Sequence, residues 1–484
     1  MDSSLNKGFL AVIATVLSAA LFFLGSGLHP VWWMAWLAPL PVYLLATRTS
    51  AVRTFAVAFF ASAIGALNEW GYLREVTPPA VTVAVLVLPA LLFAVVTLLF
   101  RFFAVRGWLL RAAFSAPAFT VAANCWYEAH SPHSTFGDPA YSQMNFLPIL
   151  QIASITGIAG IGFLLQLVPA AIAASVAPRA TRASRGAAIA VSGGILACAL
   201  GFGIYRLHSD KSAPQVTAAL LVTDERKTLS PRGKATVDMV QAYADRIPAL
   251  AAEGAEVVVI PEKIGRIPSA DLVGADRIFE NAARTNHVTI LAGFEHQPNL
   301  NEARLYAPDG TLEATYEKHH MLPAFEWYQL PGTARVTVQR PSGKWGVAIC
   351  KDMDFPLLSR QYALDGAGLM LVPAWDFVTD GWLHGRMAVL RGVESGFSMA
   401  RAPKQGILTL TDDRGRVLAE HVTGDASPGM APFAALVGRI PVREEPTFYA
   451  RHGDWFAWAD FVLALALFIP VRRKVAPSRD ISSK

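Results

Sequence analysis

Residues 345–352 read WGVAICKD, an apolar run that ends in Cys350 and leads directly into KDMDFP, where we expect a helix to begin. Two other segments have a similar layout, with VVVIPEK at residues 257–263 and YEKHHMLP at residues 316–323. In each segment an ionisable residue stands where a strand is expected to end. A sheet holds such residues rigidly while the following loop leaves them accessible. Glu262, Lys318 and Cys350 are therefore candidate reactive groups.

Between residues 206 and 455, short β-rich runs alternate with helical patterns, which predicts an α/β layered sandwich. Strands are expected at residues 216–222, 257–261, 288–293, 305–307, 315–317, 346–350, 369–373, 406–411 and 436–440. Helices are expected at residues 234–252, 270–286, 356–365 and 383–400.

The three candidate residues suit nucleophilic catalysis by a thiol. A thiol with a pKa of about 8.5 is mostly protonated at neutral pH, so it needs a base or a nearby positive charge. Glu262 can serve as the base, and Lys318 can stabilise the thiolate and then an oxyanion, helped by the backbone N–H of Lys351. Taken singly, the cysteine is more often a buried small hydrophobe and the two charged residues are more often surface groups.

The composition indicates a membrane protein. Hydrophobic residues make up 53% of the 484 residues and charged residues only 16%, against about 25% in soluble domains. The deficit of charge lies in residues 8–205, whereas residues 206–450 have an ordinary content of charged residues, Gly and Pro. The net charge of +5 does not indicate a nucleic-acid partner, because the basic residues gather in short loops beside apolar runs.

A helix needs about 20 residues to cross a bilayer, and eight apolar runs approach that length. They lie at residues 8–25, 31–47, 54–73, 81–103, 112–128, 157–177, 187–205 and 456–471. The first run resembles a signal peptide, but a second run follows so closely that we interpret both as spans. This predicts a membrane domain with seven helices at 1–205, an extracytoplasmic catalytic domain at 206–455, and an eighth helix with a basic tail at 456–484.

Basic residues follow every even-numbered run: Arg48 and Arg53, then Arg101, Arg106 and Arg111, then Arg179, Arg182 and Arg185, then Arg472, Arg473 and Lys474. The opposite loops contain few, with Arg74 beside Glu75 and none between residues 128 and 145. Lys and Arg accumulate on the cytoplasmic side of short loops. Both termini are therefore expected in the cytoplasm and the catalytic domain outside it.

Three further groups of residues leave alternatives open. The polar stretch 128–151 is either the lip of a lipid-entry site or a plain loop. Arg386, Arg391 and Glu394 form either a solvated or interdomain face, or contacts to a phospholipid headgroup. The adjacent residues His319 and His320 would point to opposite faces of a strand, so we expect no metal site there.

The three segments with Glu262, Lys318 and Cys350 resemble the signatures of the nitrilase, or carbon-nitrogen hydrolase, superfamily. Nearly the whole chain is similar to the apolipoprotein N-acyltransferase family, which places a nitrilase domain between spans seven and eight. The similarity extends to Glu128, residues 141–143 and residues 449–455. The resemblance implies an α-helical membrane domain with eight spans plus an α/β nitrilase-type αββα sandwich.

The resemblance also implies a function. Cys350 would take an acyl chain from a phospholipid as a thioester and pass it to the N-terminal amine of a diacylated lipoprotein, with Glu262, Lys318 and Glu326 assisting. We expect no metal, no other cofactor and no nucleic-acid partner. We expect the protein to be a monomer in the bacterial inner membrane. Substrate-binding roles are implied for four residues: Lys351, Asp352, Trp375 and Tyr141.

The chain departs from the family pattern in three places. Lys351 and Asp352 stand where the family has an aromatic residue and a glutamate, residues 373–377 read PAWDF, and a glutamine expected near Thr223 is missing. These departures keep three alternatives open: a different amine acceptor, a membrane-tethered amidase or other nitrilase-type hydrolase, and a scaffold with an idle triad.

Overall fold

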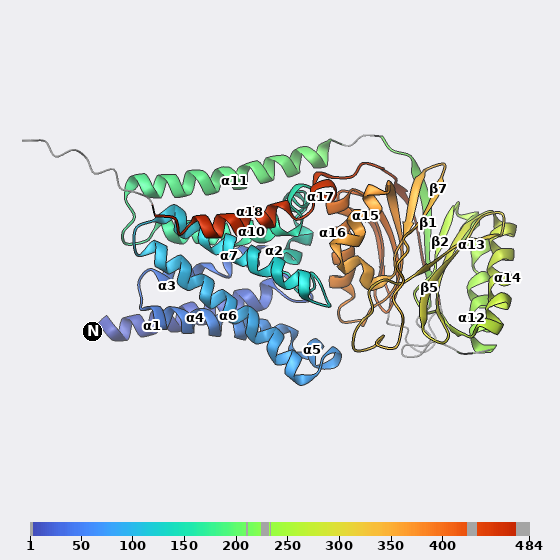
Figure 1. Ribbon diagram of the computed structural model, residues 1–484, viewed down its shortest axis with the longest axis horizontal. Helices are drawn as coiled ribbons and strands as arrows, with labels where there is room; N and C mark the ends of the chain where they lie inside the picture. The colour runs from blue at the N-terminus through green and yellow to red at the C-terminus, as the bar shows by residue number, and fades with distance from the viewer. Residues whose placement is uncertain (1–2, 210–211, 224–231, 233, 424–432, 471–484) are drawn as a thin grey trace, which may run out of the picture.

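The computed structural model describes residues 3–209, 212–223, 232, 234–423 and 433–470. The molecule is elongated, with a bundle of helices in one half and a β-sandwich in the other (Figure 1). The N-terminal end and the end of α18 (Trp455–Ala466) both lie at the end of the bundle farthest from the sandwich (Figure 1). The predicted basic tail, with Arg472, Arg473 and Lys474, lies outside the described residues.

Helices occupy every apolar run that the sequence contains. They are α1 (Ser3–Gly25), α2 (Trp32–Leu37), α3 (Leu40–Ala46), α4 (Ala51–Gly65), η1 (Ala66–Glu69), α5 (Trp70–Val76), α6 (Pro79–Ala104), α7 (Leu109–His130), α10 (Ile158–Ser175), α11 (Arg182–His208) and α18. Short helices, η2 (Pro139–Asn145), α8 (Leu147–Leu150) and α9 (Ala153–Thr156), connect α7 to α10. The seventh run continues to His208, three residues past the predicted limit of 205.

The predicted count of eight spans is not confirmed. Among the described residues, five helical stretches are long and apolar enough to cross a membrane: 6–25, 51–76, 79–104, 158–175 and 182–208. The second run is divided into α2 and α3 around Pro39, since a proline cannot supply the hydrogen bond that a continuous helix needs. The described part of α18 has 12 residues, and α7 carries polar residues such as Asn124 and Glu128.

Two sheets form the sandwich, and the described residues contain 13 strands. One sheet has the order β13-β1-β2-β4-β5-β6, with β3 beside β4, and the other has the order β12-β11-β10-β9-β8-β7. The first-sheet strands are β1 (Gln215–Val222), β2 (Val257–Val259), β3 (Arg266–Ile267), β4 (Thr289–His296), β5 (Leu300–Tyr306), β6 (Leu312–Glu317) and β13 (Ala434–Pro441). The second-sheet strands are β7 (Val336–Arg340), β8 (Gly343–Val347), β9 (Ala367–Trp375), β10 (Ser398–Lys404), β11 (Ile407–Thr411) and β12 (Val417–Val422).

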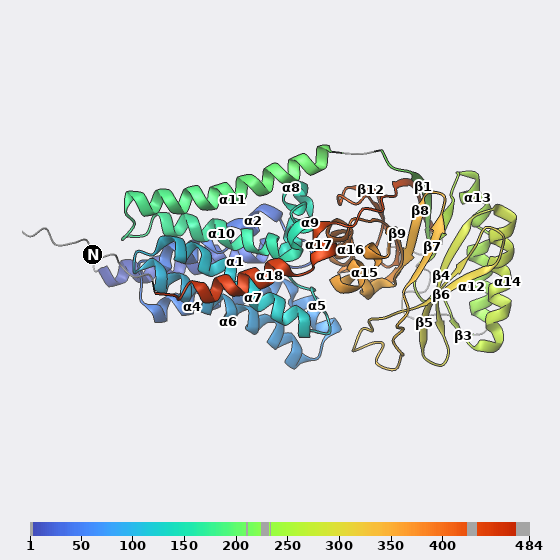
Figure 2. The ribbon, with the colours of Figure 1, turned by 45° about the horizontal axis from the view of Figure 1, so that its top comes forward.

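Helices cover both outer faces, which gives four layers in the order αββα. The first sheet carries α12 (Lys234–Ala244), α13 (Ile247–Ala252) and α14 (Ser269–Asn286). The second sheet carries α15 (Pro356–Leu364) and α16 (Gly381–Ser395), which lie between that sheet and the helical bundle (Figures 1 and 2). The short helix α17 (Phe448–His452) leads back into the bundle. The predicted layered sandwich is therefore confirmed.

The sequence placed most elements of the sandwich within a few residues, with three differences. The helix predicted at 383–400 ends at Ser395, because Gly396 adopts a left-handed conformation and residues 398–404 form strand β10. The helix predicted at 234–252 is two helices, and the second begins at Ile247 with Pro248 in its first turn. Strands β3, β7 and β12 were not predicted, since they are short or lie at sheet edges with mixed polarity.

Helix α16 forms most of the junction between the two halves. Its Arg391 and Glu394 are fully buried and pair at 3.2 Å. Arg391 donates to the Tyr141 hydroxyl at 3.0 Å, and Glu394 accepts the backbone N–H of Ile158 at 2.8 Å. Both contacts cross from the sandwich to the bundle. Of the alternatives left open by the sequence, the structure therefore supports an interdomain face for these two residues and not a solvated one.

A second buried contact joins α16 to the bundle. His384 lies 3.0 Å from Asp380, and Asp380 accepts a hydrogen bond from Tyr72 of α5 at 2.8 Å. Burial alone would lower the pKa of His384, but the charge of Asp380 outweighs it and raises the pKa from 6.5 to about 9. Burial would raise the pKa of Asp380, but the positive charge of His384 outweighs it and lowers the pKa to about 2. The junction therefore contains an imidazolium–carboxylate pair at neutral pH.

This pair predicts a pH-dependent stability. Because folding raises the pKa of His384, its contribution is complete below pH 6.5 and is lost as the pH rises through about 9. The contribution is at most about 3 kcal/mol. The difference in Tm between the wild type and His384→Gln, measured in detergent, should shrink steadily from pH 6.5 to pH 10. The exposed His208 provides a control, since His208→Gln should leave the profile unchanged; a constant difference for His384→Gln would contradict the prediction.

Candidate active site

Glu262 lies just beyond the C-terminal end of β2, an interior strand of the first sheet, and it is buried. Its backbone N–H donates to the carbonyl of Ala374 in the second sheet at 3.3 Å, so this turn also connects the two sheets. Gly293 of β4 allows the turn to sit so close. A Cβ there would lie 2.6 Å from the Pro261 carbonyl oxygen and 2.7 Å from the Glu262 Cα.

Lys318 directly follows β6 and brings two carboxylates together. Its Nζ lies 2.9 Å from Oε1 of Glu262 and 2.8 Å from Oε2 of Glu326. Glu326 belongs to the loop that follows Lys318, and its carboxylate also accepts the backbone N–H of Leu322 at 2.8 Å. All three charged residues are at most 4% exposed. The structure thus brings together three of the four residues predicted to be catalytic.

Two residues of this cluster were missed by the sequence analysis. Asn301 of β5, which lies beside β6, donates to Glu262 at 2.6 Å and to Glu326 at 3.0 Å. Lys263 pairs with Glu326 and lies 4.0 Å from Glu262. Nothing in the sequence around Asn301 distinguishes it from any polar strand residue. Lys263 could have been recognised as a candidate, since it stands next to Glu262 in VVVIPEK.

The cluster fixes the charge of its members. Burial would lower the pKa of Lys318, but Glu262 and Glu326 outweigh it and raise that pKa well above its usual value. Burial would raise the pKa of Glu326, but Lys318 and Lys263 outweigh it and lower that pKa. Lys318 is therefore a permanent ammonium and Glu326 a permanent carboxylate at any physiological pH.

Cys350 begins the short helix η3 (Cys350–Asp354), just after β8. Its φ of 47° lies in the left-handed region, which a residue with a side chain adopts only when its surroundings impose it. Its thiol donates to the carbonyl oxygen of Trp375 at 3.5 Å, and the residue keeps partial exposure. This strained turn presents the sulfur at the edge where the two sheets meet.

The environment of Cys350 raises the pKa of its thiol. Burial is the largest cause, the charge of Glu262 adds to it, and the charge of Lys318 opposes it. The resting group is therefore a neutral thiol. Because both Glu262 and Lys318 act on the thiol electrostatically, a base and a cation are available for its deprotonation.

Asp352 has a different environment from the one its predicted binding role implies. Its carboxylate is fully buried and accepts the Tyr316 hydroxyl at 2.7 Å and the His320 backbone N–H at 2.9 Å. It also accepts the backbone N–H of Ile349 at 3.0 Å. Asp352 therefore ties the Cys350 turn to the segment that follows Lys318, and its substrate-binding role stays a prediction.

Lys351 and Tyr141 make their side-chain contacts at the junction with the bundle. The Lys351 Nζ lies 3.2 Å from Asp354 and 3.3 Å from His133 of the bundle. Tyr141 is 2% exposed, and its hydroxyl contacts Arg391 and Thr135 at the junction. The structure places both residues at the contact between sandwich and bundle, so their predicted substrate-binding roles stay without support from these contacts.

A second buried ion pair acts electrostatically on the thiol. Arg401 of β10 binds the carboxylate of Asp376 through two hydrogen bonds of 2.6 and 2.8 Å. Lys404 stacks on the ring of Trp375 at 3.4 Å, and its Nζ donates to the backbone carbonyl of Lys263 at 2.9 Å. These contacts fix Trp375, whose carbonyl accepts the thiol hydrogen. Arg401 and Lys404 were missed because the sequence analysis assigned the start of β10 to a helix.

The arrangement combines a thiol, a carboxylate base and a buried ammonium at one edge of a two-sheet sandwich. This is the chemistry of an acyl-enzyme mechanism, in which a thioester forms and is then resolved. Within the described part of the chain, no group of three His, Cys, Asp or Glu side chains is placed to hold a metal ion.

Comparison with known families agrees with this geometry. A family model described as carbon-nitrogen hydrolase matches residues 234–421, so the sandwich is a nitrilase-type domain. A second, described as the apolipoprotein N-acyltransferase N-terminal domain, matches residues 18–171. The chain carries both domains and is similar to several curated apolipoprotein N-acyltransferases, which confirms the resemblance seen in the sequence.

Curated relatives share modest identity. The apolipoprotein N-acyltransferase of Geobacter metallireducens is 26% identical over 303 residues, or 55% of each chain. That of Gloeobacter violaceus is 28% identical over 264 residues, or 47% of each chain. That of Thermotoga maritima is 32% identical over 127 residues, covering 25% of this chain and 23% of the relative. The matches thus span about half or less of the length of these relatives.

Among solved structures, an amidase from Nesterenkonia sp. is similar with 19% identity and a TM-score of 0.39, covering 48% of this chain and 92% of the amidase. The NitFhit protein of C. elegans is similar with 19% identity and a TM-score of 0.40, covering 48% of this chain and 62% of that protein.

The opposite effects of Glu262 and Lys318 on the thiol predict a split between reactivity and turnover. Glu262→Gln removes a negative charge, so the pKa of Cys350 should fall and its alkylation by iodoacetamide should be faster at pH 8. If Glu262 is the base, the same variant should lose acyl transfer by 100-fold or more, in the range of about 10²–10⁴ for general-base catalysis. Lys318→Met should slow both reactions.

Alkylation is measured on the intact protein by mapping the peptide that contains Cys350, which separates it from Cys125 and Cys198. A glutamate-to-glutamine change at the exposed Glu253 is the matched control and should change neither rate. Slower alkylation of Glu262→Gln, or full acyl transfer by it, would contradict the assignment.

Proposed function

We propose that the chain is a phospholipid-dependent N-acyltransferase. It moves a fatty acyl chain through a Cys350 thioester to the N-terminal amine of the diacylglyceryl-cysteine of a lipoprotein. The observation that carries this proposal is the position of the nucleophile turn. Its Asp352 is bound by residues next to Lys318, while the backbone carbonyl of Asp354 accepts a hydrogen bond from Thr135 of the bundle at 3.0 Å. The reactive thiol is thus attached to the part of the chain that carries the apolar helices.

In the first half-reaction, Glu262 accepts the proton of the Cys350 thiol as the sulfur attacks the ester carbonyl of a phospholipid. The Lys318 ammonium and the backbone N–H of Lys351 stabilise the oxyanion that forms. When the carbon–oxygen bond breaks, Glu262 returns the proton to the leaving oxygen. A thioester and a lysophospholipid result.

In the second half-reaction, the lipoprotein amine attacks the thioester carbonyl and gives a proton to Glu262. The intermediate collapses with loss of the Cys350 sulfur, which recovers that proton. Glu326 and Asn301 act as positioning residues that keep the Lys318 ammonium and the Glu262 carboxylate in place. The cycle consumes no metal or dissociable cofactor.

The loop between Lys318 and β7 supports a lipid substrate. It buries Glu326 yet exposes the neighbouring apolar residues Phe325, Trp327 and Leu330, of which Trp327 is 79% exposed. Exposed apolar clusters on a protein surface indicate contact with a partner or a membrane. A long acyl chain cannot leave the bilayer without a cost of about 0.8 kcal/mol per exposed CH₂. The site that takes up the acyl chain must therefore reach that chain at the membrane interface.

We further propose the orientation given by the charge pattern. The basic loops and both termini lie in the cytoplasm, and the sandwich lies on the outer face of the bacterial inner membrane. A single copy contains the complete cluster around Cys350, so the proposed active form is a monomer.

The direct test uses the full chain in nanodiscs that contain phosphatidylethanolamine, with a synthetic diacylated lipopeptide as acceptor. A triacylated lipopeptide should appear by mass spectrometry, and Cys350→Ala should reduce its formation to background. Cys198→Ala, which removes an exposed cysteine of α11, should retain full activity.

Release of free fatty acid at the same rate with and without the lipopeptide would show a hydrolase instead and overturn the transferase proposal. Neither product, from protein whose Cys350 still reacts with iodoacetamide, would overturn any lipid-directed activity.

A further inference from the structure

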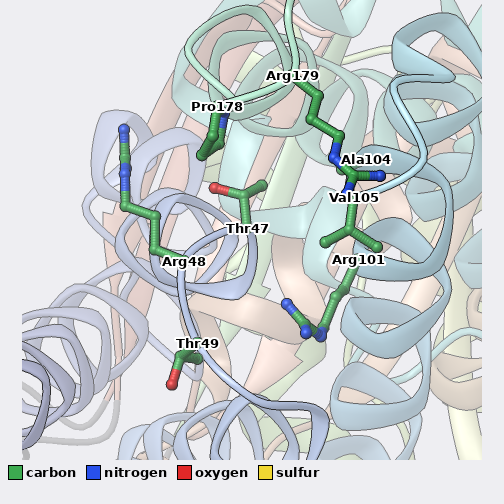
Figure 3. A pocket seen from close by; sticks show the side chains of 8 residues that line it. All are labelled: Thr47, Arg48, Thr49, Arg101, Ala104, Val105, Pro178 and Arg179. Carbon is green, nitrogen blue, oxygen red and sulfur yellow. The ribbon is translucent and has the colours of Figure 1, made fainter. Parts of the chain in front are cut away.

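A cavity of about 530 Å³ lies at the end of the bundle farthest from the sandwich. It lies between the link from α3 to α4, the C-terminal end of α6 and the link from α10 to α11 (Figure 3). The lining residues are Thr47, Arg48, Thr49, Arg101, Ala104, Val105, Pro178 and Arg179. None of them takes part in the site around Cys350.

Three arginines from three different segments surround this cavity. Among the described residues, none of Arg48, Arg101 and Arg179 forms an ion pair with a carboxylate. Arg48 donates to the carbonyls of Leu44 and Val176 at 3.1 and 3.3 Å, and Arg101 donates to that of Ala46 at 2.5 Å.

Those carbonyl contacts use only part of the arginine donors, because each guanidinium has five N–H groups. They also show a structural role, since cations at helix C-termini offset the helix dipole. A dipole end carries roughly half a charge, so it does not neutralise a whole guanidinium. Three arginines therefore line one cavity in which no carboxylate of the described residues neutralises them.

Thr49 also lines the cavity. Its side chain is 8% exposed, and its hydroxyl oxygen has no hydrogen-bond partner within the described ranges. A buried hydroxyl without a partner costs free energy that an added acceptor or donor can recover. The cavity thus combines unneutralised cations with an unsatisfied hydroxyl.

We propose that this cavity binds a phosphate-bearing anion, which in the bilayer is the headgroup of an anionic phospholipid from the leaflet opposite the sandwich. Arginine suits phosphate because its planar fork donates two parallel hydrogen bonds. The volume lies within the range of about 300–1,000 Å³ that ligand pockets occupy. Basic pockets between helix ends on the cytoplasmic side favour such headgroups.

The bound phosphate joins segments that meet at this end of the bundle. It neutralises Arg48, Arg101 and Arg179 together and so links the ends of α3, α6 and α10. The site is separate from the acyl donor site and stabilises the bundle without entering the transfer reaction.

The test measures the Tm of the full chain in a neutral detergent while three probes are added separately: phosphatidylglycerol, dioleoylglycerol and inorganic phosphate. Phosphatidylglycerol should raise the Tm by several degrees and dioleoylglycerol, which lacks the phosphate, should not. A rise with inorganic phosphate as well would show that the phosphate group alone is sufficient, whereas a rise with phosphatidylglycerol alone would assign the site to the lipid headgroup.

Arg48→Gln/Arg179→Gln should weaken the effect of phosphatidylglycerol at least tenfold in half-maximal concentration. Arg185→Gln, an exposed arginine at the same end, should leave it unchanged. Should the double variant fold poorly, Arg179→Gln alone serves, because no hydrogen bond of the Arg179 side chain occurs among the described residues.

Equal responses of the wild type and the arginine variants would overturn the proposal, as would no response of the wild type to any phosphate-bearing probe. Loss of the response in Arg185→Gln to the same extent would also overturn it, since that would show attraction to the basic end as a whole and not binding in the cavity.

Discussion

A buried ammonium held between two carboxylates organises the edge of the sandwich where the chemistry is proposed. Lys318 contacts Glu262 at 2.9 Å and Glu326 at 2.8 Å, and Asn301 bonds both carboxylates from the neighbouring strand. Removing one partner of such a pair leaves an uncompensated buried charge, at a cost of about 3–5 kcal/mol. The cluster cannot rearrange cheaply, so the base and the cation stay fixed relative to the Cys350 turn.

That fixed edge also depends on how the sandwich sits on the bundle. Asp352 joins the nucleophile turn to the residues after Lys318, and Lys351 and the carbonyl of Asp354 reach the bundle. Lys351 and Asp352, two of the residues at which this chain departs from the family pattern, therefore use their side chains at these connections. Their substitution is compatible with unchanged chemistry because the charged cluster is made by other residues.

The sequence predicted the αββα sandwich because its strands are short buried apolar runs and its helices are amphipathic, patterns that local periodicity reports. It also predicted Glu262, Lys318, Cys350 and Glu326, through motifs and family resemblance. It could not predict Asn301 or the pairing of Arg401 with Asp376, since these depend on which strands lie side by side. The substrate-binding roles of Tyr141 and Asp352 stay predictions, and the sequence could not show that both residues are buried, because that burial arises from tertiary packing. The count of eight spans is not confirmed, since the second apolar run is divided at Pro39.

The central claim is that the cluster around Lys318 makes Cys350 an acyl carrier. Intact-protein mass spectrometry of the full chain after exposure to phosphatidylethanolamine, without any acceptor, tests it most directly. We predict an added mass equal to one fatty acyl chain, located on the Cys350 peptide and removed by hydroxylamine. Unmodified Cys350 in folded protein, or an acyl group found on any other residue, would contradict the account.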